Sequence, residues 1–145
     1  MRYLAIDYGK KRTGLAICDA DEKIVSPLKI IQGQKNILTK IIEITMAEGV
    51  EAIVLGLPFN MDGSEGFQAK LVREFAKKLK ESLPLAVYFQ DERLSSFGAE
   101  EKLASAGFTK AAQKDRLDAV AAAEILEAFL EQKHSTGETG TDPAP

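Results

Sequence analysis

Residues 2–18 read RYLAIDYGKKRTGLAIC. Two apolar, strand-forming runs, 2–8 and 13–18, flank a short turn that contains Gly9. Hairpins need only a few connecting residues, so this spacing predicts two antiparallel strands. A third strand is expected at residues 24–31, and Pro27 should place it at a sheet edge or in a bulge because proline cannot donate to the ladder.

The rest of the chain alternates between helical and strand patterns. The stripe from Ile37 to Met46 recurs at three and four residues and ends before Gly49, which predicts a helix. Short, wholly apolar runs are typical of strands covered on both faces. The further elements expected are strands at 52–55 and 85–89 and helices at 66–82, from Ser95 or Ser96 to Gly107, and from about Arg116 to Lys133, with a mobile polar stretch at 109–116.

This order predicts an α/β fold. Three antiparallel strands followed by two helix-linked strands form a mixed five-stranded sheet with helices on both faces. The chain has 145 residues, 45% of them hydrophobic and 28% charged, which is ordinary for one globular domain. We expect that domain at residues 1–133. Residues 134–145 are rich in Gly, Thr and Pro, and we expect a disordered tail there.

Composition also excludes several classes of protein. No apolar run reaches the roughly 18 residues of a membrane span, and the acid at Asp7 interrupts any signal-peptide pattern. Cys18 is the only cysteine, so neither an internal disulfide nor a Cys-rich zinc site is possible. It is expected to be a buried small side chain. These features favour a cytoplasmic protein that does not bind membranes.

Charge is unevenly distributed along the chain. The formal net charge is −3, yet residues 1–40 hold eight Lys and Arg against four Asp and Glu, most densely at Lys10, Lys11 and Arg12. Salt screens distant acids beyond about 10 Å, so a local basic patch on an acidic protein can still bind phosphates. Aromatic residues make up 7% of the chain and Trp is absent, so base stacking is not expected to dominate.

Three acids lie where a sheet could gather them. Asp7 closes a strand, Glu92 and its neighbour Asp91 follow another, and Asp118 opens the last helix. Asp118 shares a helix face with the apolar residues Ala122, Ile125 and Phe129, and a carboxylate aimed at a core needs a partner or a metal. An all-carboxylate site selects Mg²⁺ or Mn²⁺ and suits phosphoryl chemistry.

Each acid also has a plain structural interpretation. Asp7 could pair with Lys10 or Arg12, Glu92 could form a surface ion pair with Arg93, and Asp118 could complement a helix dipole. The spacing of Gly9 and Gly14 is not a P-loop, because no Lys-Ser/Thr or helix follows the second glycine. The joint pattern of acids therefore carries the catalytic hypothesis.

Four motifs, taken together, resemble the YqgF/RuvX family of RNase H-like proteins related to the RuvC resolvases. The resemblance covers about residues 1–133 and rests on DYGKKRTGLA at 7–16, GLPFNMDGS at 56–64, DERLS at 91–95 and DAVAA at 118–122. It implies an RNase H-like fold and a cytoplasmic nuclease that processes the 5′ end of precursor 16S ribosomal RNA, or resolves Holliday junctions.

The resemblance also implies site residues. Asp7, Glu92 and Asp118 would be the catalytic and metal-binding acids, with Mg²⁺ or Mn²⁺ as cofactor. Asp91 stays a rival to Glu92, because adjacent residues of an extended segment point opposite ways. Nucleic acid would be bound by Lys11, Arg12, Asn60 and Arg93, where phosphate contacts set register and affinity.

Several alternatives stay open. The expected partner is a structured precursor ribosomal RNA or a branched DNA, bound by a monomer or a weak homodimer. A non-catalytic RNA-binding module of the same fold would show salt-sensitive binding without cleavage. An ATPase of the actin/Hsp70 type shares the core, but it needs two domains to close over its nucleotide.

Overall fold

The computed structural model describes residues 1–94 and 110–136, without the side chains of residues 94, 110–118 and 136. In the described part the strands form one sheet in the order β3-β2-β1-β4-β5. β1 pairs antiparallel with β2 and parallel with β4, β2 pairs antiparallel with β3, and β4 pairs parallel with β5. This confirms the predicted mixed sheet. The strands are β1 (Tyr3–Asp7), β2 (Arg12–Cys18), β3 (Val25–Gln32), β4 (Ala52–Leu57) and β5 (Ala86–Asp91).

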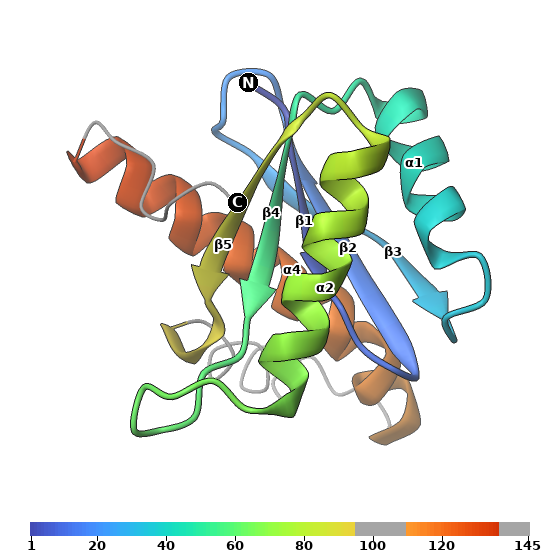
Figure 1. Ribbon diagram of the computed structural model, residues 1–145. Coiled ribbons are helices and arrows are strands. Elements are labelled where there is room, and N and C mark those ends of the chain that lie inside the picture. Colours follow the sequence, from blue (N-terminus) through green and yellow to red (C-terminus); the bar gives the residue numbers. More distant parts are fainter. Residues whose placement is uncertain (95–109, 137–145) are drawn as a thin grey trace.

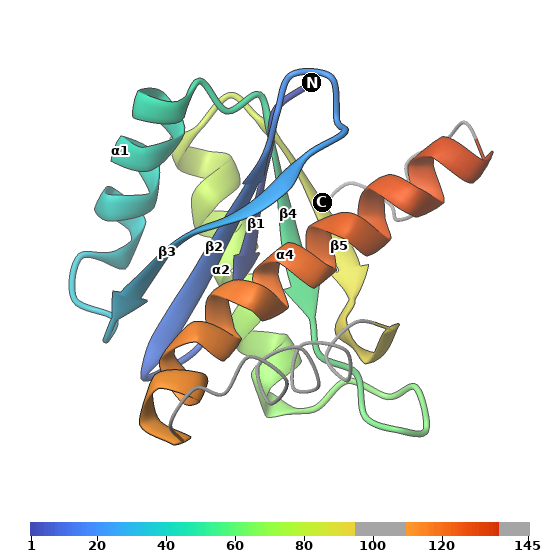
Figure 2. The ribbon, with the colours of Figure 1, turned by 180° about the vertical axis from the view of Figure 1, so that it is seen from behind.

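Helices cover both faces of the sheet, as predicted (Figures 1 and 2). The helices α1 (Ile37–Glu48) and α2 (Phe67–Ser82) pack on one face, and α4 (Lys110–Thr136) crosses the other. Apolar side chains alternate along each strand, so they form one core under α1 and α2 and a second core under α4. The sheet is therefore buried on both faces, which accounts for the short, wholly apolar runs of β4 and β5.

Local signals in the sequence account for several boundaries. β3 lies at the sheet edge, and its register with β2 shifts between Leu15 and Ala16, where Pro27 pairs with Ala16. Both expectations for Pro27 are confirmed. α1 ends at Gly49, which adopts the left-handed conformation (φ 65°, ψ 38°), as the glycine predicted.

α4 is longer at both ends than the predicted helix. Residues 110–116 belong to the helix, whose start was expected near Arg116, because the segment from Lys110 to Gln113 consists of strong helix formers that continue into the apolar stripe. The helix also runs to Thr136, beyond the boundary expected at residue 133. The helix predicted from Ser95 or Ser96 to Gly107 and the tail at 137–145 lie outside the described residues.

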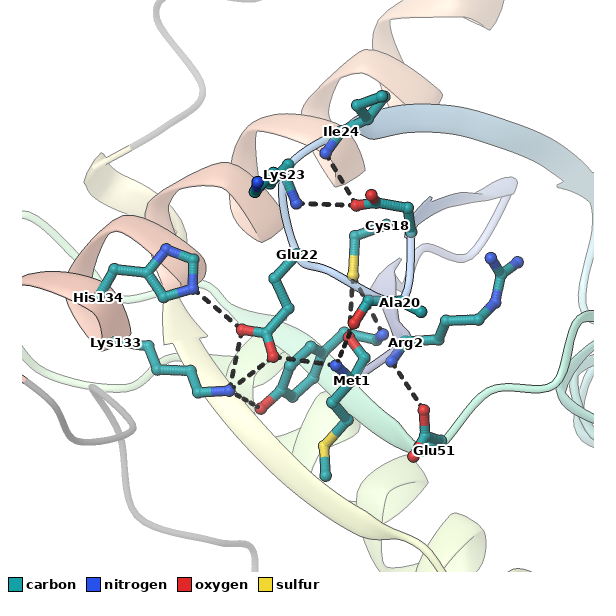
Figure 3. Close-up of polar contacts among 12 residues, drawn as sticks. Met1, Arg2, Cys18, Ala20, Glu22, Lys23, Ile24, Glu51, Lys133 and His134 are labelled. Atoms are coloured by element: carbon teal, nitrogen blue, oxygen red, sulfur yellow. Dashed lines mark hydrogen bonds and ion pairs between the residues drawn. The ribbon is translucent and has the colours of Figure 1, made fainter.

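The C-terminal turn of α4 is fastened to the β2–β3 connection by one acid (Figure 3). Glu22 accepts hydrogen bonds from Lys133 Nζ at 2.9 Å, and lies 3.0 Å from His134 Nε2 and 3.1 Å from the amino group of Met1. Lys133 also donates to the hydroxyl of Tyr3 in β1. These bonds fix where α4 lies on the sheet and hence where its first turns fall.

Cys18 is 1% exposed and lies beside this network, as the sequence predicted for a buried small side chain. Burial is the main cause that raises the pKa of its thiol. In the part of the chain that the structure describes, no helix combines the length and apolar character of a membrane span.

Candidate active site

The carboxyl ends of β1, β4 and β5 meet at one edge of the sheet, because these three strands run parallel (Figure 1). Asp7 is the last residue of β1, the central strand. Glu92 comes directly after β5 and opens the short 3₁₀ helix η1 (Glu92–Leu94). The two acids, far apart in sequence, are hydrogen-bonded to each other through their side chains.

This carboxylate pair is electrostatically strained. Burial is the largest cause that raises the pKa of Glu92, followed by the hydrogen bond and the negative charge of Asp7 and by the charge of Asp91. Two carboxylates in contact cannot both ionise cheaply, so the contact with Asp7 favours the protonated form of Glu92. A divalent cation would replace that proton and neutralise both groups. The donor set therefore fits a hard cation such as Mg²⁺ or Mn²⁺.

A glycine in β4 makes room for Glu92. A Cβ atom on Gly56 would lie 2.8 Å from Glu92 Oε1, 2.9 Å from its Cγ and 2.5 Å from Cδ1 of Ile125 on α4. Any larger residue at 56 would push Glu92 or α4 away from the sheet. Gly56 opens the motif at 56–64, and an isolated glycine at the end of an apolar strand is the usual signal of a close approach.

Asp91, the rival to Glu92, faces a different partner. Its carboxylate binds the guanidinium of Arg93, with Nη2 at 2.7 Å and Nε at 3.0 Å from Oδ2. It also accepts a hydrogen bond from the backbone N–H of Arg93 at 2.9 Å. The side-chain hydrogen bond from Arg93 is the main cause that lowers the pKa of Asp91. Of the two neighbours, Glu92 is thus the one that meets Asp7.

Asp118 lies in the first half of α4, and its side chain is outside the described part. The face to which it was assigned is apolar as predicted: Ala122, Ile125 and Phe129 are at most 1% exposed. α4 packs against β1 and β4 and contacts η1. Among the described side chains, which do not include that of Asp118, no group of three or more potential metal ligands occurs.

Basic residues lie in the hairpin that follows Asp7. Lys11 is exposed in the turn between β1 and β2, and Arg12 is the first residue of β2. The turn is tight, because a Cβ on Gly9 would overlap the carbonyl oxygen of Arg12. Gln34 and Gln68 donate to the carbonyls of Gly9 and Tyr8 at 3.2 and 3.0 Å and so hold this hairpin from both sides.

The loop from Pro58 to Gly66 borders the same edge on its other side and is internally bonded. Asn60 and Ser64 pair through backbone and side chain, and Asp62 accepts from both the N–H and the hydroxyl of Ser64. Arg93 donates to the carbonyl of Asn60 at 3.3 Å and lies over the ring of Phe59. The predicted binding residues Asn60 and Arg93 are therefore in direct contact.

A mixed sheet in the order β3-β2-β1-β4-β5 with helices on both faces is an RNase H-like fold. The solved structures agree on the fold. RuvC of Thermus thermophilus in complex with a Holliday junction superposes with a TM-score of 0.65 at 15% identity, covering 99% of both chains. The resolvase of Fowlpox virus, in complex with junction DNA, gives 0.57 at 15% identity over 91% of this chain and 98% of the other.

Sequence comparison identifies the family. The model of RuvX, described as Holliday junction resolvase, matches residues 1–132. Relatives in Lawsonia intracellularis and Syntrophomonas wolfei, each named "Putative pre-16S rRNA nuclease", are 40% and 41% identical over 137 and 133 residues. These matches cover 93% and 90% of this chain and 96% and 94% of the relatives. The chain belongs to the RuvX family, whose members are nucleases and thus hydrolases of phosphodiester bonds.

Proposed function

We propose that this protein is a divalent-metal-dependent nuclease that matures the 5′ end of precursor 16S ribosomal RNA in the cytoplasm. The observation that carries the proposal is the hydrogen-bonded pair Asp7 and Glu92 at the carboxyl edge of the sheet, bordered by the basic hairpin. The relatives named as pre-16S rRNA nucleases support the choice of substrate.

The acids Asp7, Glu92 and Asp118 would hold Mg²⁺ or Mn²⁺. When bound, such an ion supplies Lewis-acid activation of water and stabilises charge on the leaving oxygen. Lys11 and Arg12 would bind the phosphates on either side of the scissile bond, and the loop with Asn60 and Arg93 would line the other wall. Water adds to phosphorus, the bond to the 3′ oxygen breaks, and the proton passes to that oxygen, which leaves a 5′ phosphate.

The experiment compares the wild-type protein with Asp7→Asn and Glu92→Gln on a structured precursor 16S fragment, with Mg²⁺ or Mn²⁺. We expect both variants to lose cleavage and, in calorimetry, to lose Mn²⁺ binding. Asp21→Asn removes an exposed acid from the β2–β3 connection, away from the site, and serves as the matched control. Cleavage that survives Asp7→Asn would refute the metal-site proposal.

A second candidate function, resolution of Holliday junctions in DNA, is favoured by the description of the family model. A resolvase that cuts two strands symmetrically needs a dimer that presents two sites, whereas we propose a monomer or a weak homodimer. A four-way DNA junction in the same cleavage assay, with sedimentation of the protein alone, separates the two. Paired cuts by a stable dimer would favour the resolvase.

A further inference from the structure

One exposed aromatic residue lies next to the turn between β1 and β2. Phe67 is the first residue of α2, and 67% of its surface is exposed. The ammonium of Lys10, in the turn between β1 and β2, lies over its ring, with Nζ 5.1 Å from the ring centroid. Unlike the aromatic rings buried in the two cores, this ring is open to solvent and available to a ligand.

This pair lies at the same edge of the sheet as Asp7, on the side covered by α2. Lys10 follows Asp7 by three residues, so their Cα atoms are at most about 11 Å apart. Gln68, next to Phe67, donates to the carbonyl of Tyr8 at 3.0 Å. The ring of Tyr8 stacks on Phe75 of α2, with 4.2 Å between centroids and 12° between planes. The start of α2 and the hairpin thus form one rigid unit.

The chemistry of the pair fits a nucleotide. We propose that Phe67 and Lys10 form a stacking platform for an unpaired nucleotide of the bound substrate, with the base on the Phe67 ring and its phosphate on the Lys10 ammonium. This inference rests on the proposed nuclease function and names a feature of its substrate. Base stacking on an aromatic ring is stronger than an exposed cation–π contact, so a base can displace Lys10 from the ring.

Charge favours a nucleic acid over a protein partner at this position. Lys70 follows Phe67 by one helical turn on the same side of α2 and is exposed, and the first turn of α2 holds no acid. Lys10 and Lys11 lie in the adjacent turn. The platform therefore has cations on two sides. They could bind the phosphates of a strand whose unpaired base stacks on the ring. Substrates with a single-stranded nucleotide near the cleavage site should be preferred to continuous duplexes.

Binding in the absence of divalent cations tests the platform independently of cleavage. With EDTA present, we expect Phe67→Ala to weaken binding of a short single-stranded RNA about tenfold and to leave duplex binding unchanged. Met46→Ala, which removes an exposed apolar side chain from the far end of α1, is the matched control. Lys10→Ala should weaken binding and flatten its salt dependence, whereas Lys23→Ala, in the β2–β3 connection, should not.

Fluorescence gives a second readout. The chain has no Trp, so Phe67→Trp introduces a single tryptophan on the platform, which can be excited selectively over the three tyrosines. Single-stranded RNA should quench it, and inorganic polyphosphate, which has charge but no bases, should not. Equal quenching by both, or unchanged RNA binding by Phe67→Ala, would overturn the platform while leaving the nuclease proposal intact. Weakened binding by Phe67→Ala in a protein that cleaves nothing would support the platform and refute the nuclease.

Discussion

Glu92 lies directly over the backbone of Gly56, so closely that a Cβ atom there would come within 2.8 Å of the carboxylate oxygen Oε1. Gly56 pairs with Gln90 across the parallel strands β4 and β5. The absence of a side chain in β4 is therefore what lets an acid beyond β5 reach the acid at the end of β1. The position of the carboxylate pair depends on this contact as much as on the acids themselves.

Gly56→Ala should lower both the stability of the fold and the affinity of the carboxylate pair for metal, and a second substitution should separate the two effects. We expect the free energy of unfolding to fall by about 1–3 kcal/mol, because the new methyl group overlaps Glu92 and Ile125. The double variant Gly56→Ala with Ile125→Val removes the overlap on α4 but not that on Glu92. Denaturant titration should show partial recovery of stability, and calorimetry should show Mn²⁺ affinity still reduced. Full recovery of metal affinity would contradict the role given to Gly56.

The raised pKa of Glu92 makes stability depend on pH. A group whose pKa is higher in the folded than in the unfolded state binds more protons when folded, so stability falls as pH rises above the unfolded value of about 4.5. Glu92→Gln removes this titration. In EDTA at pH 8 we expect the variant to be more stable than the wild type by at least about 1 kcal/mol, the equivalent of one pKa unit. Urea titrations of both proteins at pH 5 and pH 8 measure this difference in the free energy of unfolding.

The control for that comparison is the divalent cation itself. Mn²⁺ should stabilise the wild type at pH 8 and leave Glu92→Gln much less affected, since a ligand that binds only the folded state adds to its stability. Wild-type stability that stays level between pH 5 and pH 8 without metal would show that Asp7 and Glu92 do not share a proton.

Much of this arrangement is predictable from the sequence, because the spacing of apolar residues indicates which face of a strand or helix is buried. Strand ends place Asp7 and Glu92 at one sheet edge, and the apolar stripe of the last helix places Ala122 and Phe129 in the core. The choice between Asp91 and Glu92 is not predictable in this way. It depends on Arg93, which binds Asp91 and leaves Glu92 for Asp7.

The remaining features are set by tertiary contacts that have no periodic signal. The role of Gly56 depends on Glu92 and Ile125, which lie far away in sequence. In the sequence, Phe67 looks like one more apolar residue of an amphipathic helix. Its exposure beside Lys10 follows from the packing of α2 against the hairpin. The start of α4 at Lys110 depends on helix propensity in a stretch whose polarity suggested a loop.

Glu22 should govern stability in acid. Burial alone raises the pKa of Glu22, but hydrogen bonds from Lys133, His134 and the terminal amino group outweigh it and bring the pKa down to about 2. The associated stability is complete above pH 4.5 and is lost as pH falls toward 2, and it amounts to at most about 3 kcal/mol. Glu22→Gln should be less stable than the wild type at pH 7, and its stability should vary less with pH below pH 4.5.

Nuclease activity at pH 7 provides the control for this variant, because Glu22 lies among residues of the β2–β3 connection and the C-terminal turn of α4 (Figure 3). Any loss of activity should be explained by the unfolded fraction. A second comparison is His134→Ala, whose side chain is 52% exposed and should contribute less. A variant Glu22→Gln with the acid stability of the wild type would contradict the assigned role.

Arg93 should act on the loop from Pro58 to Gly66 rather than as a simple positive charge. Its guanidinium binds Asp91 in a fork and the carbonyl of Asn60 at once, a geometry that lysine cannot reproduce. We expect Arg93→Lys to accelerate hydrogen exchange at the amides of Asn60, Gly63 and Ser64 almost as much as Arg93→Ala does. Global stability should change little, because an exposed ion pair contributes little.

Kinetics distinguishes the two roles of Arg93. If it holds the loop, Arg93→Lys and Asp91→Asn should both raise KM for the RNA with a smaller effect on kcat, because each breaks the same fork. If it contributes charge alone, Arg93→Lys should retain wild-type KM and Asp91→Asn should lower it by removing a negative charge beside the substrate. Retention of loop protection in Arg93→Lys would therefore assign Arg93 to the phosphates, together with Lys11 and Arg12.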